Sequence, residues 1–281
     1  MISKNCFIKY KKLCVTALYI FVALFVYSCR KDIEAIPAKS YDPTVGVVSQ
    51  LKDDQAFMPG KYIFFQVLQQ PDAIDSAASV SINVFGKFSS DITGTPVNAG
   101  NILIDHSLAI TSGPGNVYQY TYDQNSLSKG KASMGHYIDV QVEGSNAVEP
   151  LTRKLYVPGP IFLTGLYKSV STISNNKSYH VSWNADPQNM FGKVLIQVDY
   201  YAGLSVYHNA ANPASVKSLV YVTADNGNFI IPATDLQRFP VSSYVSISIS
   251  RATDNSWPTA KGTIEYIAVS SSLSSPILVE N

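Results

Sequence analysis

Apolar and polar residues alternate over many short segments of this chain. Val80, Ile82 and Val84 alternate with small polar residues, and the same spacing of two recurs in the segments 138–143 and 245–250. This spacing places the apolar side chains on one face of a β-strand. Further segments predict strands in the same way, or strands that are buried on both faces: Tyr62–Leu68, Asn116–Tyr122, Lys193–Tyr201, Leu219–Val222 and Thr263–Val269.

Turn-forming residues separate these segments, and no segment carries a helical pattern for more than a turn or two. The expected turns are Met58-Pro59-Gly60, Gly113-Pro114-Gly115, Ser128-Lys129-Gly130 and Asp225-Asn226-Gly227. Many short strands joined by such turns are typical of β-sandwiches. Two prolines and a glycine at 157–160 interrupt any ladder and divide the chain near its middle. The sequence therefore predicts an all-β protein of two consecutive β-sandwiches, residues 44–157 and 158–281, with one continuous jelly roll as the alternative.

The first 28 residues have the layout of a secretory signal peptide. Four lysines, with no acidic residue among them, precede the apolar run Leu13–Tyr27. As a helix this run spans about 22 Å, which is shorter than the roughly 30 Å hydrocarbon core of a bilayer. We therefore expect the segment to be cleaved and not kept as a membrane span.

The segment Val26-Tyr27-Ser28-Cys29 resembles the lipobox of bacterial lipoproteins. The resemblance implies that Cys29 carries a lipid, becomes the first mature residue and ties the protein to a membrane. The cysteine count agrees, because Cys6 and Cys14 would leave with the signal peptide and Cys29 would otherwise remain as a lone thiol. A plain signal peptide cut elsewhere is the alternative.

Residues 29–43 predict a tether. Its charged start, Arg30–Glu34, resembles the surface-export signals of Bacteroidetes-type lipoproteins, which implies an outer-membrane protein that faces the cell surface more readily than the periplasm. The full chain has 21 basic and 20 acidic residues, and removal of the four signal-peptide lysines leaves a net charge of about −3. This balance gives no basic surface for nucleic acid.

The second half resembles a fibronectin type III or related immunoglobulin-like domain. The resemblance rests on Ser178–Asn184, on Val194–Tyr200, and on Leu236 and Phe239-Pro240 leading to Tyr244. It implies that Trp183 fills the core, that Tyr244 forms a tyrosine corner and that Asp225-Asn226-Gly227 is a hairpin turn. The first half shows the general alternation of immunoglobulin-like domains.

No motif gathers catalytic or metal-binding groups. The four histidines, His106, His136, His180 and His208, are scattered, and the acid pairs Asp53/Asp54 and Asp72/Asp75 each lie within one short loop. The sequence also has no nucleophile elbow, phosphate loop or dinucleotide fingerprint. We therefore expect a protein that is not an enzyme and that needs no metal or cofactor.

Tyrosine is abundant, with 18 Tyr against 12 Phe and 2 Trp. Exposed aromatic rings on a rigid sheet suit stacking on sugar rings or anchoring of a protein partner, whereas buried ones belong to an ordinary core. Both interpretations stay open for the candidate ligand-stacking residues Tyr118, Tyr120, Tyr122, Tyr200, Tyr201, Tyr207 and Trp257.

Two functions are consistent with these features. The first is a non-catalytic binding or adhesion module for glycan or protein, similar to the accessory lipoproteins of nutrient-uptake systems. The alternative is a structural spacer or assembly component of an envelope complex or fimbria-like appendage, with affinity in its sheet edges.

Overall fold

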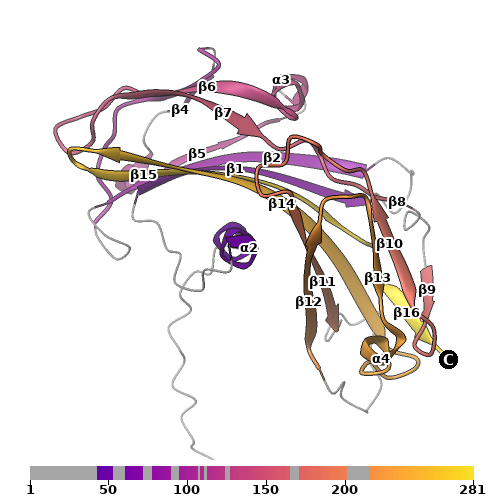
Figure 1. The fold of residues 1–281 in the computed structure, drawn as a ribbon. Helices are drawn as coiled ribbons and strands as arrows, with labels where there is room; N and C mark the ends of the chain where they lie inside the picture. The colour runs from indigo at the N-terminus through magenta and orange to yellow at the C-terminus, as the bar shows by residue number, and fades with distance from the viewer. Residues whose placement is uncertain are drawn as a thin grey trace, which may run out of the picture. The chain divides into compact units, whose positions relative to one another are not determined.

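The computed structural model describes residues 43–52, 61–71, 78–89, 95–106, 108–110, 113–123, 127–164, 171–200 and 216–281 (Figure 1). Most of these residues lie in strands that form sheets of nine, four and three strands. The predicted all-β fold class is therefore confirmed. The predicted signal peptide, Cys29 and its tether, Tyr201, Tyr207, His208 and both loop acid pairs lie outside the described residues.

The first core lies between the four-stranded sheet and one part of the nine-stranded sheet. The four-stranded sheet runs in the order β4 (Leu108–Ile110), β3 (Ile102–Ile104), β6 (His136–Val142) and β7 (Leu151–Val157). It faces β1 (Lys61–Pro71), β2 (Ala78–Phe88) and β5 (Tyr118–Thr121). The alternating residues of β2 and β6 point into this core, as their period of two predicts.

The second core lies between the three-stranded sheet and the other part of the nine-stranded sheet. The three-stranded sheet consists of β8 (Leu163–Thr164), β10 (Tyr179–Trp183) and β13 (Asn228–Ile231). Opposite it lie β9 (Ser171–Ser174), β11 (Lys193–Tyr200), β12 (Ser218–Ala224) and β16 (Ile277–Glu280). Trp183 is buried here, as the fibronectin resemblance implies.

A long hairpin takes part in both cores (Figure 1). It consists of β14 (Tyr244–Thr259) and β15 (Gly262–Leu273), paired without interruption from Ser248↔Leu273 to Thr259↔Gly262. The start of β14 buries Val245 in the second core, whereas its end and β15 contribute Trp257 and Tyr266 to the first. β1 pairs with β15 in parallel, so the last long strand completes the first sandwich.

The chain changes core at the predicted boundary, because Val157 belongs to the first core and Ile161 to the second. Residues 257–268 then return to the first core. The two sandwiches thus share the β14–β15 hairpin. The division into separate domains at residues 157 and 158 stays a prediction.

Two helices lie where no helix was predicted. A ten-residue helix, α2 (Pro43–Lys52), begins at the last residue of the predicted tether and occupies the start of the segment that was predicted as the first sandwich. The predicted turn Ser128-Lys129-Gly130 is instead part of α3 (Leu127–Ala132). Gly130 serves close packing there, since a Cβ atom would lie 2.8 Å from Ile82 Cδ1. The described residues contain two further short helices, η1 (Pro114–Asn116) and α4 (Ala233–Leu236).

The turn Asp225-Asn226-Gly227 forms, but it does not close a hairpin. It joins β12 to β13, and these strands belong to different sheets. Gly227 has a φ of +89°, which explains the glycine. Tyr244 is half-buried at the start of β14, and the hydroxyl bond of a tyrosine corner stays a prediction.

Candidate functional site

The tyrosine stripe on β5 belongs to the first core and is not a ligand platform. Tyr118 is completely buried, and its hydroxyl donates to Gly100 O (2.8 Å) and accepts from Ala99 N–H (2.8 Å). Burial raises the pKa of Tyr122 to about 12, with the charges of Tyr120 and Asp105 adding to the effect. Tyr120 is partly buried and packs edge-on against Tyr122, with ring centroids 5.0 Å apart. The ligand-stacking interpretation of these three residues is therefore corrected.

The other aromatic candidates do not form one surface. Tyr200 packs against the second core and stacks on Phe239, whereas Trp257 is buried in the first core. Tyr201 and Tyr207 lie outside the described residues. Tyr200 and Trp257 therefore serve different cores and do not offer one stacking surface.

One tyrosine that the candidate set lacks is the most exposed aromatic residue of the described segments. Tyr137 on β6 exposes 67% of its surface. Its ring lies 5.5 Å from that of Tyr156, which stands opposite it on β7. The sequence contained a signal for it: Ile138, Val140 and Val142 face the core, so Tyr137 must face outward.

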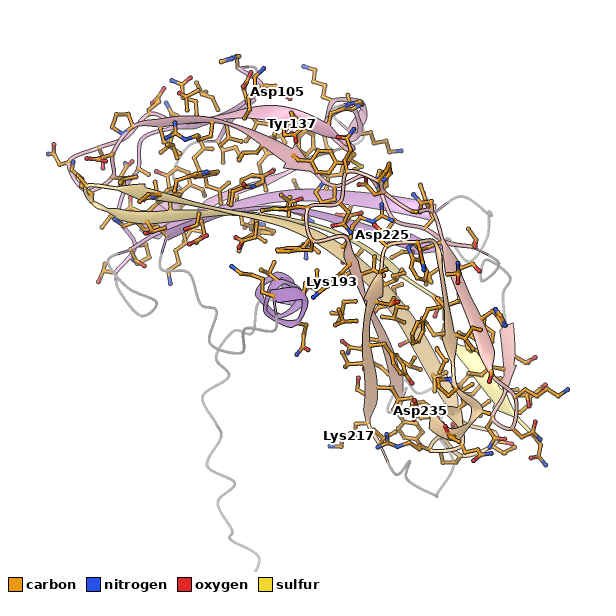
Figure 2. The ribbon with its side chains drawn as sticks, viewed as in Figure 1. Asp105, Tyr137, Lys193, Lys217, Asp225 and Asp235 are labelled. Carbon is orange, nitrogen blue, oxygen red and sulfur yellow. The ribbon has the colours of Figure 1, made fainter. Side chains whose placement is uncertain are left out.

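Polar groups surround Tyr137 on the outer face of the four-stranded sheet (Figure 2). Figure 2 labels Tyr137 and Asp105 at this sheet. Asp139 lies two residues further along β6, with Lys154 opposite it on β7. Asp139 Oδ2 lies 3.7 Å from Nε2 of the exposed His106. Asp105 is fixed next to Asp139, because its Oδ1 accepts a hydrogen bond from the Asp139 N–H (2.9 Å). We call Asp105, His106, Tyr137, Asp139, Lys154 and Tyr156 the tyrosine platform.

Tyr156 lies beside Tyr137 on the same face of the sheet and is fixed by Asp186. Its hydroxyl donates to the Asp186 carboxylate at 2.8 Å and 2.9 Å. Burial and then the hydrogen bond to Asp186 raise the pKa of the Tyr156 phenol, which therefore stays protonated as a donor. The exposed ring of Tyr137 thus rests on a side chain of fixed position.

Asp186 belongs to a buried charge cluster between the two cores, which we call the joint. Its centre is Arg251 on β14, whose side chain is completely buried. Arg251 Nη1 lies 3.5 Å from Asp186 Oδ2, and its Nε lies 3.4 Å from Asp225 Oδ2. Arg251 Nη2 also donates to the carbonyl of Asn184. One arginine therefore ties together segments that follow β10 and β12.

Neutral donors complete the joint. Trp183 Nε1–H donates to Asp225 Oδ1 (2.8 Å), and the Asn189 amide donates to Asp225 Oδ2 (2.9 Å). Gly159 N–H, next to the change of core, donates to Asp186 Oδ2 (3.0 Å). Figure 2 labels Asp225 in this region. Sequence reasoning treated Asp225 as a turn residue, because contacts between distant segments leave no local signal.

The pKa values of the joint follow from this packing. Burial alone would raise the pKa of Asp186, but the donors Gly159 N–H and Tyr156 O–H, with the Arg251 charge, leave it below its ordinary value. Burial lowers the pKa of Arg251, against the opposing charges of Asp225 and Asp186. Asp186 and Arg251 thus form a buried pair of opposite charges, and neutral donors bond the oxygens of both Asp186 and Asp225.

The described residues contain no group of three or more histidine, cysteine or acidic side chains that could hold a metal ion. His106 lies on the platform, and His136 and His180 are exposed at separate strands. Among the helices of the described segments, none is long and apolar enough to cross a membrane.

Comparisons with known proteins do not assign a family. No protein-family model and no curated protein matches the chain. The chain is similar to the yeast delta-COP-I mu-homology domain, with 11% identity, 79% of this chain and 98% of that chain covered and a TM-score of 0.26. It is also similar to the I-band fragment I67–I69 from titin, with 12% identity, 77% and 65% coverage and a TM-score of 0.17.

Proposed function

We propose that this protein is a membrane-anchored cell-envelope lipoprotein that acts as a non-catalytic binding or adhesion module. In this proposal its two sandwiches are immunoglobulin-like, the second of fibronectin type III type. The lipid on Cys29 holds it at the outer membrane, facing the cell surface. The observation that carries the binding role is the exposed Tyr137 ring on the outer face of a rigid sheet.

The chemistry of the platform favours a glycan as the ligand. A tyrosine ring offers a flat apolar surface on which the C–H face of a sugar ring can stack. Asp139 and Asp105 lie beside it with carboxylate oxygens that accept hydrogen bonds from sugar hydroxyls. The described residues give no enzyme-like arrangement on this surface, and the proposal requires no cofactor or metal. A protein partner is the second class of ligand.

Binding is tested with purified protein on a glycan array. Tyr137→Ala should abolish selective sugar binding, whereas Tyr137→Phe should keep it because the ring is retained. Ile230→Ala is the matched control, since Ile230 is an exposed apolar residue on β13 of the other sandwich. Sugar binding that survives Tyr137→Ala would contradict the platform. Binding of envelope proteins alone would favour the second ligand class.

The anchor needs a separate test. Labelled palmitate should enter the wild-type protein, and Cys29→Ala should remove the label. Globomycin, which blocks lipoprotein signal peptidase, should leave the signal peptide attached. An acyl chain adds about 0.8 kcal/mol per buried CH₂, so loss of the lipid should release the protein from membranes. An unlabelled wild-type protein would contradict the lipoprotein proposal.

A specific observation favours the structural alternative, a spacer or assembly component. The β14–β15 hairpin runs through both cores, and Arg251 ties the two sandwiches together. Such a connection suits a stiff element of an envelope complex or fimbria-like appendage. Co-purification of envelope partners that is unaffected by Tyr137→Ala would support this function over sugar binding.

A further inference from the structure

A second buried charge cluster lies on the opposite face of β14, beneath α2. The helix packs Val48 and Leu51 against Leu195 of β11, Ala252 of β14 and Ile267 of β15. These side chains form a small apolar cluster on the outer face of the nine-stranded sheet, where α2 lies in Figure 1. The helix thus covers polar residues that would otherwise face solvent.

The last residue of α2 reaches one of these covered residues. Lys52 Nζ lies 2.6 Å from Asp254 Oδ2, and Asp254 is only 6% exposed. An acidic side chain at an outward position of an antiparallel strand is ordinarily solvated. Here the docked helix removes the water and supplies a cation in its place.

A second carboxyl group lies next to Asp254. Glu265 stands opposite Ser256 on the neighbouring strand, two pairs away from Asp254 on the same face, and its Oε1 accepts the Ser256 hydroxyl (2.8 Å). The remaining oxygens, Asp254 Oδ1 and Glu265 Oε2, are buried with no hydrogen-bond donor in the described part of the chain. Two ionised carboxylates can only accept, so neighbouring buried oxygens of this kind are satisfied when one of them carries a proton.

We propose that Asp254 and Glu265 share one proton beneath α2, and that the loss of this proton weakens the docking of α2 on the sheet. The protonated carboxyl group donates a hydrogen bond to the other carboxyl group, and Lys52 then balances the single remaining negative charge. Without the proton, two negative charges face one ammonium group, and the Asp254 carboxylate is buried. The pair is thus a pH-sensitive latch on the helix that joins the predicted tether to the body.

The electrostatics agree with this geometry. Burial raises the pKa of Glu265, and the Asp254 charge adds to the shift, while Ser256 and Lys52 oppose it. A raised folded pKa means that the stabilisation is present at low pH and is lost as the pH rises through that value. The docking of α2 should therefore weaken toward alkaline pH.

Other charged groups around the latch do not supply the missing donor. Lys87 on β2 stands opposite Tyr62, which is the partner of Glu265 on β1. Lys193 occupies the same outer face of β11 as Leu195. Asp53 and Asp54 follow Lys52 in the chain and lie outside the described residues. These groups contribute to the local electrostatic potential. The buried oxygens without a hydrogen-bond donor in the described part of the chain belong to Asp254 and Glu265.

Hydrogen exchange of the full chain tests the latch. We expect the exchange protection of the α2 amides, corrected for intrinsic rates, to fall roughly five- to tenfold between about pH 5 and about pH 8, the ratio expected for one lost buried hydrogen bond. Glu265→Gln should remove this pH dependence and keep the protection high, because its amide donates as the protonated acid does. Glu280→Gln, at an exposed position on β16, is the control and should behave as the wild type.

A spectroscopic measurement keeps the proposal testable if a variant folds poorly. The carbonyl band of a protonated carboxyl group should persist to higher pH in the infrared spectrum of the wild type than in that of Glu265→Gln. Protection of α2 that is equal at both pH values, or a carbonyl band that is lost at the same pH in both proteins, would overturn the proposal.

Discussion

The two faces of β14 carry buried charges that are stabilised in different ways. Arg251 faces inward, between the cores, where it lies against two carboxylates that also accept hydrogen bonds from N–H and O–H donors. Asp254 faces outward, beneath α2, with one cation and a neighbouring acid. Each cluster has two acids and one base. N–H and O–H donors bond both carboxylates of the joint, whereas Asp254 Oδ1 and Glu265 Oε2 of the latch have no hydrogen-bond donor in the described part of the chain. The same strand therefore holds two clusters whose stability should respond to pH in opposite directions.

The largest expected effect comes from breaking the joint. Arg251→Met should lower the free energy of unfolding by about 3–5 kcal/mol, because Asp186 and Asp225 would remain buried without a counter-charge. Urea unfolding measures this change. Arg153→Met, at an exposed arginine of β7, should change it by less than about 0.5 kcal/mol. An equally small loss for Arg251→Met would mean that the joint does not hold the cores together.

A smaller effect is expected from removing one donor of the joint. Tyr156→Phe deletes the hydroxyl that bonds the Asp186 carboxylate, and such a bond to a charged group contributes about 1.5–3 kcal/mol. The same urea measurement applies, with Tyr137→Phe as the control because the Tyr137 side chain is exposed. Equal stability of the two variants would contradict the role of Tyr156.

The opposite pH responses can be separated with two variants. Asp186 has a pKa below its ordinary value when folded, so its stabilisation is present at neutral pH and is lost as the pH falls through that lowered pKa. Unfolding midpoints between about pH 3 and about pH 8 should therefore lose part of their acid dependence in Asp186→Asn. Glu265→Gln should instead reduce the fall of the unfolding midpoint as the pH rises. If one variant reduced the pH dependence of the unfolding midpoint at both low and high pH, the two clusters would be coupled.

The smallest effect on stability is expected at the platform. Tyr137→Ala should change the free energy of unfolding by less than about 0.5 kcal/mol, because the ring is exposed. Tyr118→Ala should lower the free energy of unfolding by about 3–5 kcal/mol, since it leaves a cavity at a buried position. Thermal or urea unfolding compares the two. A large loss for Tyr137→Ala would assign this tyrosine to structure and not to binding.

The strands could be predicted because their alternation is local. Val245, Ile247 and Ile249 face the second core as their spacing requires, and the same parity continues to Trp257 in the first core. Which core each part enters is decided by distant strands, so alternation could not show it. Arg251 occupies an inward position of this series, and a charge at such a position is the one local sign of the joint.

α2 and the tyrosines of β5 show that a local sequence pattern carries no information on tertiary contacts. α2 contains the β-branched Val47 and Val48, which favour helices weakly, and it is stabilised by docking on the sheet. The Asp42-Pro43 pair was its available signal, since Asp before Pro is typical of a helix start. For Tyr118, Tyr120 and Tyr122 the alternation was right, but the side of β5 that meets a second sheet depends on β3 and β6.

The parallel pairing of β1 with β15 sets the order in which this protein can mature. Ile63 and Ile82 enter their core early in the chain, yet the strand that seals it ends at Leu273. β1 cannot pair with β15 until Leu273 has been synthesised, which makes folding slow and dependent on non-local contacts. Premature stop codons before Leu273 should consequently damage both halves of the molecule, and chaperone demand should last until β15 has left the ribosome.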